Sequence, residues 1–238
     1  MIILIAESKT MVEQEMPVDL QELQAHTPVD EGMADSIMER IAGMPADEIA
    51  EIVRVSPNMA AGIMRMAYEF PNKQTGLMAM EAYTGVVFKA FDYKSLSVEQ
   101  KQNTCACVRI ISSLYGWLRP DDIIKRYRLD YTTPIAQGDQ TLWACQRNET
   151  TAQLLKDLQE SGQRDILNLL PENAEKCIDW KQVKSLAKMR KVDFKEMTDG
   201  GALRTPNAGR LKTMRGTLLR EIIERGIDSP TQLTSLHT

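Results

Sequence analysis

Three short, continuous runs of apolar residues constrain the fold of this chain most. They lie far apart in the sequence, at residues 2–6, 105–112 and 165–170. An apolar run of four to eight residues, bounded by turn-forming residues, indicates a strand that is buried on both faces. Residues 85–91 (GVVFKAF) have the same character and predict a further strand. The chain is therefore expected to fold around a sheet whose strands come from distant segments.

Helical patterns fill most of the sequence between these runs. Ser56 followed by Pro57 marks one helix start, because Ser caps a helix and Pro fits its first turn. Asp199-Gly200-Gly201 predicts a late hairpin. The expected helices cover residues 35–70 with an interruption at 43–46, 76–83, 95–103, 138–161 with a break near 148–149, and 207–225.

Strands and helices follow one another without regular alternation, which predicts an α+β fold with a mixed β-sheet surrounded by helices. No linker and no internal repeat divides the 238 residues. We therefore expect a single domain over residues 1–238, with a helical subregion at about 31–83.

Charge is distributed unevenly along the chain, although the net charge is only −4. Residues 1–100 hold 7 basic and 16 acidic residues, whereas residues 101–238 hold 22 basic and 17 acidic ones. The C-terminal part therefore offers a basic face to phosphate or nucleic acid. A solvated helix face explains the same pattern, and charge alone favours that simpler interpretation.

Cysteine and histidine are too scarce to support a metal centre or a histidine-dependent nucleophile. A single residue separates Cys105 from Cys107, and the chain has no second cysteine pair at the spacing of a zinc site. The two histidines are His26 and His237. We expect structural thiols, no metal and no cofactor. The apolar opening is too short for a signal peptide and no run is long enough to span a membrane, which predicts a cytoplasmic protein.

Cations and aromatic residues are densest at residues 110–131, directly after a predicted strand. Arginines bind phosphates and aromatic rings stack on bases, so the stretch predicts a phosphate or nucleic-acid site. Asp121, Asp122 and Asp130 offer the alternative of a structural ion-pair lattice, and the residues leave both interpretations open. The residues concerned are Arg119, Lys125, Arg126 and Arg128, with Tyr115, Trp117, Tyr127 and Tyr131.

Two further positions offer cations to the same kind of ligand. Lys212 and Arg215 are three residues apart and share one face of a predicted helix, and Gly216 permits a close approach beside them. Lys9 follows the first strand directly, and a charged residue at the end of a central strand often enters a cleft. An ordinary polar helix surface is the alternative for the first pair.

The interruption Ala42-Gly43-Met44 between two short helical segments is typical of a helix-hairpin-helix element, in which backbone N–H groups meet a phosphate. Pro45 removes one N–H group, and Asp47 adds negative charge nearby. A plain packing corner between helices is therefore the better interpretation of these residues alone.

The stretch from Ser112 to Asp122 (SSLYGWLRPDD), followed by RYRLD at 126–130, resembles the peroxide stress protein YaaA family. The similarity extends through Ser8-Lys9-Thr10, YTGVVF at 83–88, NL at 168–169 and KTMRG at 212–216, and so covers nearly the whole chain. Four positions depart from the family pattern, and they are Glu7, Ser8, Val86 and Pro171.

The resemblance implies an oxidative-stress protein that limits damage by hydrogen peroxide and iron and binds duplex, bent or junction DNA. It also implies an α+β fold with a basic cleft and a helix-hairpin-helix element. The implied cleft cations are Lys9, Arg119, Arg128, Lys212 and Arg215; the residues that shape the cleft are Tyr115, Gly116, Tyr127 and Asp122; and the hairpin is Ala42, Gly43 and Met44.

Two other functions compete with DNA binding without turnover. The same cations suit an enzyme acting on a phosphorylated or nucleotide substrate, with Asp122 or Asp130 as the base. Direct iron binding is disfavoured by the four scattered cysteines and two histidines.

Overall fold

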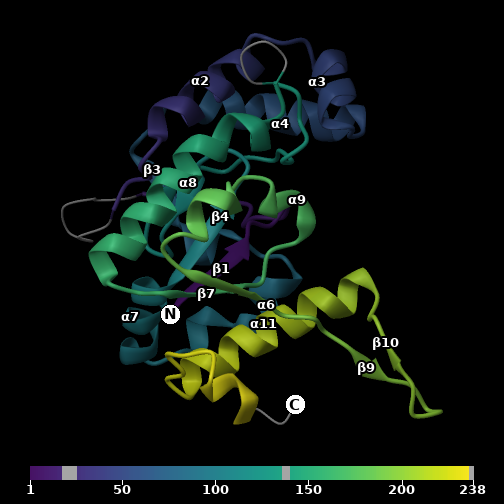
Figure 1. Ribbon diagram of the computed structural model, residues 1–238. Coiled ribbons are helices and arrows are strands. Elements are labelled where there is room, and N and C mark those ends of the chain that lie inside the picture. Colours follow the sequence, from purple (N-terminus) through teal and green to yellow (C-terminus); the bar gives the residue numbers. More distant parts are fainter. Residues whose placement is uncertain (18–25, 136–139, 236–238) are drawn as a thin grey trace.

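The computed structural model describes residues 1–17, 26–135 and 140–235, and its centre is a five-stranded sheet with the order β5-β4-β1-β7-β8 (Figure 1). Strands β4, β1, β7 and β8 are parallel, and β5 runs antiparallel beside β4. The strands are β1 (Ile2–Ala6), β4 (Val108–Ser112), β5 (Gly116–Leu118), β7 (Asp165–Asn168) and β8 (Lys188–Lys191).

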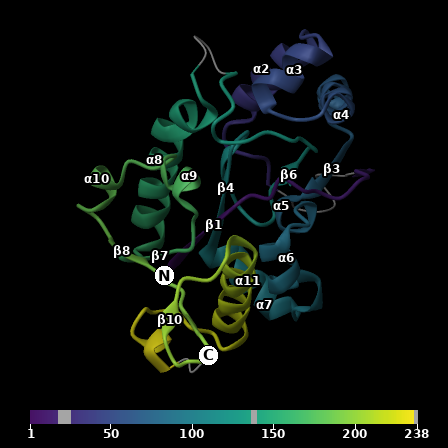
Figure 2. The same ribbon diagram turned by 90° about the vertical axis from the view of Figure 1, so that its right-hand side faces the viewer.

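Helices cover both faces of this sheet, so that β1 is buried on both sides (Figure 2). Ile2 and Leu4 pack in one apolar cluster and Ile3 and Ile5 in another, as expected when successive side chains point to opposite faces. The face of Ile2 is covered by α8 (Leu142–Ser161), α9 (Glu172–Glu175) and α10 (Trp180–Val183). The other face is covered by α6 (Val86–Phe91), α7 (Val98–Cys107) and α11 (Ala208–Glu224).

A helical subregion lies beyond the main sheet and is drawn at the top of Figure 1. Its helices α2 (Glu31–Ala42) and α3 (Ala46–Val53) both pack against α4 (Pro57–Glu69). Beneath them lies a small antiparallel sheet with the order β2-β3-β6. Its strands are β2 (Met16–Pro17), β3 (Thr75–Met78) and β6 (Ile123–Ile124).

The remaining elements are short. They are α5 (Ala79–Ala82), the 3₁₀ turns η1 (Tyr93–Ser95) and η3 (Gln232–Ser235), and the hairpin of β9 (Glu196–Met197) with β10 (Leu203–Arg204). None of the helices in the described part of the chain is both long enough and apolar enough to cross a membrane.

The predicted mixed sheet surrounded by helices is confirmed, and so are the strand at 2–6 and the late hairpin. The strand predicted over 165–170 is β7, which ends at Asn168. Ser56 caps α4, with Pro57 at its first position, as the sequence predicts. The helix predicted from 138 starts at Leu142 and runs unbroken through 148–149; residues 138–139 of that prediction lie outside the described residues.

Two strand predictions and one helix prediction are wrong in whole or in part. Residues 85–91 form helix α6, because burial of Phe88 and Phe91, three positions apart, places one helical side against the core. Residues 105–107 belong to the end of α7, and β4 begins only at Val108. Residues 76–78 are part of β3 rather than of a helix.

The corner between α2 and α3 does not confirm a helix-hairpin-helix element. The N–H of Gly43 donates to the carbonyls of Glu39 and Arg40, both at 3.2 Å, and the N–H of Met44 donates to Ile41 at 3.1 Å. These donors are therefore occupied within the chain. The corner instead sets how α2 and α3 pack on α4.

Candidate functional site

A cavity of about 480 Å³ lies where β1 and β7 end, and we call it the β1–β7 cavity. After β1, the next strand of this sheet along the chain is β4, on one side of the β1–β7 pair. After β7, the next strand is β8, on the other side of the pair. Adjacent parallel strands whose connections depart in opposite directions open a crevice at their carboxyl ends, where ligands usually bind. The volume lies within the range of small-molecule sites.

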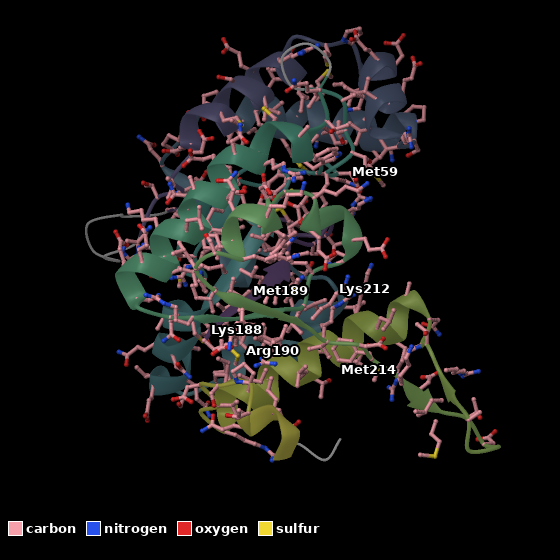
Figure 3. All side chains as sticks on the ribbon, viewed as in Figure 1. Met59, Lys188, Met189, Arg190, Lys212 and Met214 are labelled. Atoms are coloured by element: carbon pink, nitrogen blue, oxygen red, sulfur yellow. The ribbon has the colours of Figure 1, made fainter. Side chains whose placement is uncertain are left out.

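The walls of the β1–β7 cavity come from four parts of the chain. They are the loop after β1 (Ala6, Glu7, Ser8, Lys9 and Thr10), the start of α6 (Gly85, Val86, Val87 and Phe88), the pair Asp130 and Tyr131, and the segment after β7 (Pro171 and Asn173). Lys212 of α11 completes the lining, from the N-terminal half of its helix (Figure 3).

Two glycines allow these walls to approach one another. A Cβ atom at Gly85 would lie 2.1 Å from the hydroxyl oxygen of Ser8, and one at Gly216 would lie 2.2 Å from the carbonyl oxygen of Val87. A larger residue at Gly216 would therefore force two backbones apart, and one at Gly85 would displace the Ser8 side chain. The close approach at Gly216 holds α11 against α6, which brings Lys212 to the cavity.

Glu7 contributes a carboxyl group to the floor of the cavity and anchors a buried chain of hydroxyl groups. One carboxyl oxygen accepts hydrogen bonds from the N–H of Ser113 at 2.8 Å and from the hydroxyl of Tyr127. The Tyr127 oxygen lies 2.6 Å from the hydroxyl of Tyr83 and 2.7 Å from that of Ser112. This network of core groups therefore fixes the carboxyl in position.

Burial raises the pKa of Glu7 to about 7, although the hydrogen bonds from Ser113 and Tyr127 act in the opposite direction. The residue keeps partial exposure and lines the cavity, and both hydrogen bonds are accepted by the same carboxyl oxygen. Among the described residues, no cation forms an ion pair with it. A carboxyl that exchanges its proton near neutral pH in a cleft is a strong candidate for function.

Two of the five predicted cations line the cavity, and a third contacts the backbone of one of them. Lys9 is exposed and forms an ion pair with Asp130, and Arg128 donates a hydrogen bond to the backbone carbonyl of Lys9 at 2.9 Å. Lys212 lines the cavity from α11. Burial alone would raise the pKa of Asp130, but Lys9 and hydrogen bonds from Thr132 lower it. Asp130 is therefore ionised and paired, which makes it a poor base at neutral pH.

Arg215 and Arg119 lie in different surroundings. Arg215 is half-buried, which lowers its pKa, and Glu175 of α9 is the charge that opposes this effect. Arg119 follows β5, whose Leu118 pairs with Ile110 of β4. Arg119 therefore lies toward the N-terminal end of β4, away from the β1–β7 cavity at the carboxyl ends of the strands.

The residues predicted to shape the cleft also separate. Tyr127 reaches the site through Glu7, whereas the hydroxyl of Tyr115 accepts from the N–H of Lys125 at 3.0 Å inside the core. Gly116 has φ +67°, the left-handed conformation that favours glycine, where the chain turns from β4 into β5. Asp122 accepts from the N–H of Arg119 at 2.7 Å, and burial raises its pKa to about 7. Asp122 therefore supports a turn away from the cavity.

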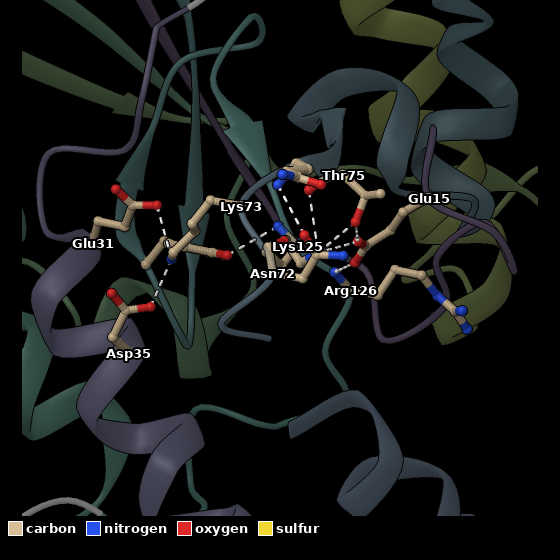
Figure 4. Close-up of polar contacts among 10 residues, drawn as sticks. Glu15, Glu31, Asp35, Asn72, Lys73, Thr75, Lys125 and Arg126 are labelled. Carbon is tan, nitrogen blue, oxygen red and sulfur yellow. Dashed lines mark hydrogen bonds and ion pairs between the residues drawn. The ribbon is translucent and has the colours of Figure 1, made fainter. Parts of the chain in front are cut away.

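Lys125 is a structural cation rather than a ligand-binding one. It is buried beside β3 and contacts the carboxylate of Glu15, the Thr75 hydroxyl at 2.7 Å and the carbonyl of Asn72 at 2.7 Å (Figure 4). Glu15 also accepts from the N–H of Arg126 at 2.7 Å. The structural lattice that the sequence left open therefore exists at Lys125, with Glu15 as its acid.

The model of the family described as peroxide stress protein YaaA matches residues 1–238 of this chain. The chain belongs to this family. A UPF0246 protein of Parabacteroides distasonis is 31% identical over 98% of this chain and 90% of its own length. UPF0246 proteins of Bacteroides thetaiotaomicron (30% identical, covering 84% of this chain and 77% of the relative) and Francisella tularensis subsp. novicida (28%, 96% and 89%) are also similar.

Membership of the peroxide stress protein YaaA family supports a general role in peroxide stress. Sequence reasoning noted Glu7 only as a departure from the family pattern and missed its place at the cavity floor. A signal was present, because a charged residue directly after a buried central strand is the same argument that selected Lys9. The other three departures, Ser8, Val86 and Pro171, also line the cavity.

Proposed function

We propose that the protein acts in the cytoplasmic response to hydrogen peroxide by binding duplex or distorted DNA at the rim of the β1–β7 cavity, which limits iron-dependent damage. The observation that carries the proposal is that Lys9 and Lys212, from separate segments, line one cavity and that Arg128 contacts the backbone carbonyl of Lys9. Cations without a fixed base-reading geometry bind phosphates and respond to DNA shape.

One further cation lies close to the carboxyl end of β7. Lys191 ends β8 opposite Asn168, the last residue of β7, although it is paired with Glu175. The ion pair with Asp130 reduces the contribution of Lys9 to phosphate binding, because the charge of that lysine is already partly neutralised. We place the corner at Ala42–Met44 outside the contact, because its N–H groups are occupied within the chain.

The test is a fluorescence anisotropy titration with labelled linear duplex, junction and single-stranded DNA over a range of salt concentrations. Three phosphate contacts predict a slope of about −3 in log K against log salt, and Lys212→Ala should reduce it by about one. Lys156→Ala is the matched control. This exposed lysine lies near the C-terminal end of α8, which leads into the start of β7 and not to its carboxyl end at the cavity. Equal effects of the two variants, or no binding at low salt, would exclude the proposal.

A further inference from the structure

The interior of the β1–β7 cavity differs chemically from its rim. A duplex cannot enter about 480 Å³, whereas a single small molecule can. Val86, Val87, Phe88 and Pro171 supply an apolar wall. Lys212 supplies positive charge at the lining, and Lys9 supplies a second positive charge that Asp130 partly neutralises. This combination suits a ligand with a ring to pack and a phosphate to neutralise.

The floor of the cavity adds the carboxyl group of Glu7, which repels anions when it is ionised. Glu7 faces the same space as Lys9 and Lys212, yet no ion pair with either lysine compensates its charge. An ionised carboxylate would repel a phosphate, but a protonated carboxyl can donate a hydrogen bond to it. Anion binding and protonation of Glu7 therefore favour each other.

We propose that the β1–β7 cavity binds one phosphate monoester of nucleotide size, with the phosphate held by Lys9 and Lys212 and the protonated Glu7 carboxyl donating a hydrogen bond to the ligand. The proposal rests on the same cations as the proposed DNA contact and names a ligand that fits the interior. It does not require that duplex DNA binds at the rim.

Glu7 is the proton acceptor in this site, because the groups that face it do not take up a proton near neutral pH. Burial raises the pKa of Tyr127, Tyr83 and Tyr131 far above neutral pH and that of the Cys177 thiol to about 12. Ser112 and Ser113 do not titrate, and Asp130 is held ionised by Lys9. A bound anion raises the pKa of Glu7 above about 7, so binding takes up a proton and affinity falls as pH rises.

The experiment is isothermal titration calorimetry with 2′-deoxyadenosine 5′-monophosphate at low salt, with deoxyadenosine as the ligand without phosphate. Affinity of the wild type should fall by about tenfold between about pH 6 and about pH 8, relative to Glu7→Gln. The comparison with Glu7→Gln removes the contribution of the ligand's own phosphate, which titrates in the same range. Lys212→Ala should weaken binding, and Lys156→Ala should not.

Tyr127→Phe provides a second, independent variant. It removes a hydrogen bond that stabilises the ionised carboxylate, so the pH midpoint for binding should move upward. No binding of the monophosphate at low salt, or identical pH dependence in wild type and both variants, would overturn the inference.

The DNA titration separates the two proposals. Monophosphate binding without duplex binding would leave this inference standing and remove the proposed function, and duplex binding without monophosphate binding would do the reverse. Glu7→Gln should leave duplex affinity close to that of the wild type, because its carboxyl lies at the floor and not at the rim.

Discussion

Glu7 and Glu15 are two partly buried glutamates whose pKa values shift in opposite directions. Burial alone would raise the pKa of Glu15, but the N–H of Arg126, the Lys125 ammonium and the Thr75 hydroxyl outweigh it, and the pKa is lowered. Glu7 receives hydrogen bonds but forms no ion pair with a described cation, and its pKa rises to about 7. One carboxyl is part of the framework, whereas the other can respond to a ligand.

The difference shows which buried acid supports a functional hypothesis. A buried ion is tolerated when an opposite charge and hydrogen bonds replace its hydration. Lys125 provides that replacement beside β3, where its ammonium group also donates to the carbonyl of Thr75 at 3.1 Å. At the β1–β7 cavity the described residues offer Glu7 no such ion pair, which leaves it able to gain or lose a proton at neutral pH.

Replacement of Lys125 by Met should have the largest effect, because it turns Glu15 into a second unpaired acid. We expect the free energy of unfolding to fall by about 3–5 kcal/mol, as measured by urea denaturation. Lys73→Ala is the control, since Lys73 is exposed where it pairs with Glu31 and Asp35, and its loss should cost less than about 1 kcal/mol. Equal losses would mean that the buried pair does not hold this region.

Glu7→Gln should have the next largest effect, and its sign depends on pH. The pKa of Glu7 is about 7 in the folded protein, against an ordinary value of 4.5, so the folded protein binds more protons than the unfolded chain between these values. Wild-type stability should therefore fall relative to the variant as pH rises through this window, by about 3 kcal/mol at pH 8. Urea denaturation at a series of pH values measures the difference.

The same measurement on Glu15→Gln sharpens the contrast. The pKa of Glu15 is lowered, so the stability it contributes is present above pH 4.5 and is lost as pH falls. The two difference curves should bend in opposite directions. Parallel curves for the two variants would contradict the distinction between the two acids.

Tyr127→Phe should have the smallest effect, about 1–2 kcal/mol on the free energy of unfolding, because a buried hydroxyl with three partners is lost. Its more informative consequence is on Glu7, whose pKa should rise further without this donor. Carbon-detected NMR titration of the Glu7 carboxyl measures the change. An unaltered titration curve would show that Tyr127 does not tune the acid.

Local sequence signals predicted a substantial part of the fold. The apolar runs at 2–6 and 165–168, the cap Ser56 with Pro57, and the glycines of the late hairpin each depend on neighbouring residues alone. The same signals misplaced 85–91, because a short apolar segment suits a strand or a buried helix equally, and packing against α11 selected the helix.

The cations show where local reasoning ends. Lys9 and Lys212 are far apart in the sequence, and crossovers and the contact at Gly216 bring them to one cavity. Arg128 joins them through its hydrogen bond to the carbonyl of Lys9. Arg119 belongs to the same motif as Arg128, yet the antiparallel return of β5 carries it to the other end of β4.

Residue type and spacing are enough to define the buried strands, the helix caps, the charge asymmetry and the family resemblance, because each of these is a local property of the chain. Which charges meet, and which are left without an opposite charge, depends instead on tertiary packing. The pKa of Glu7 illustrates this, since it depends on burial by groups over 75 residues away in the chain, and the pairing of Lys125 with Glu15 arises from the same long-range packing.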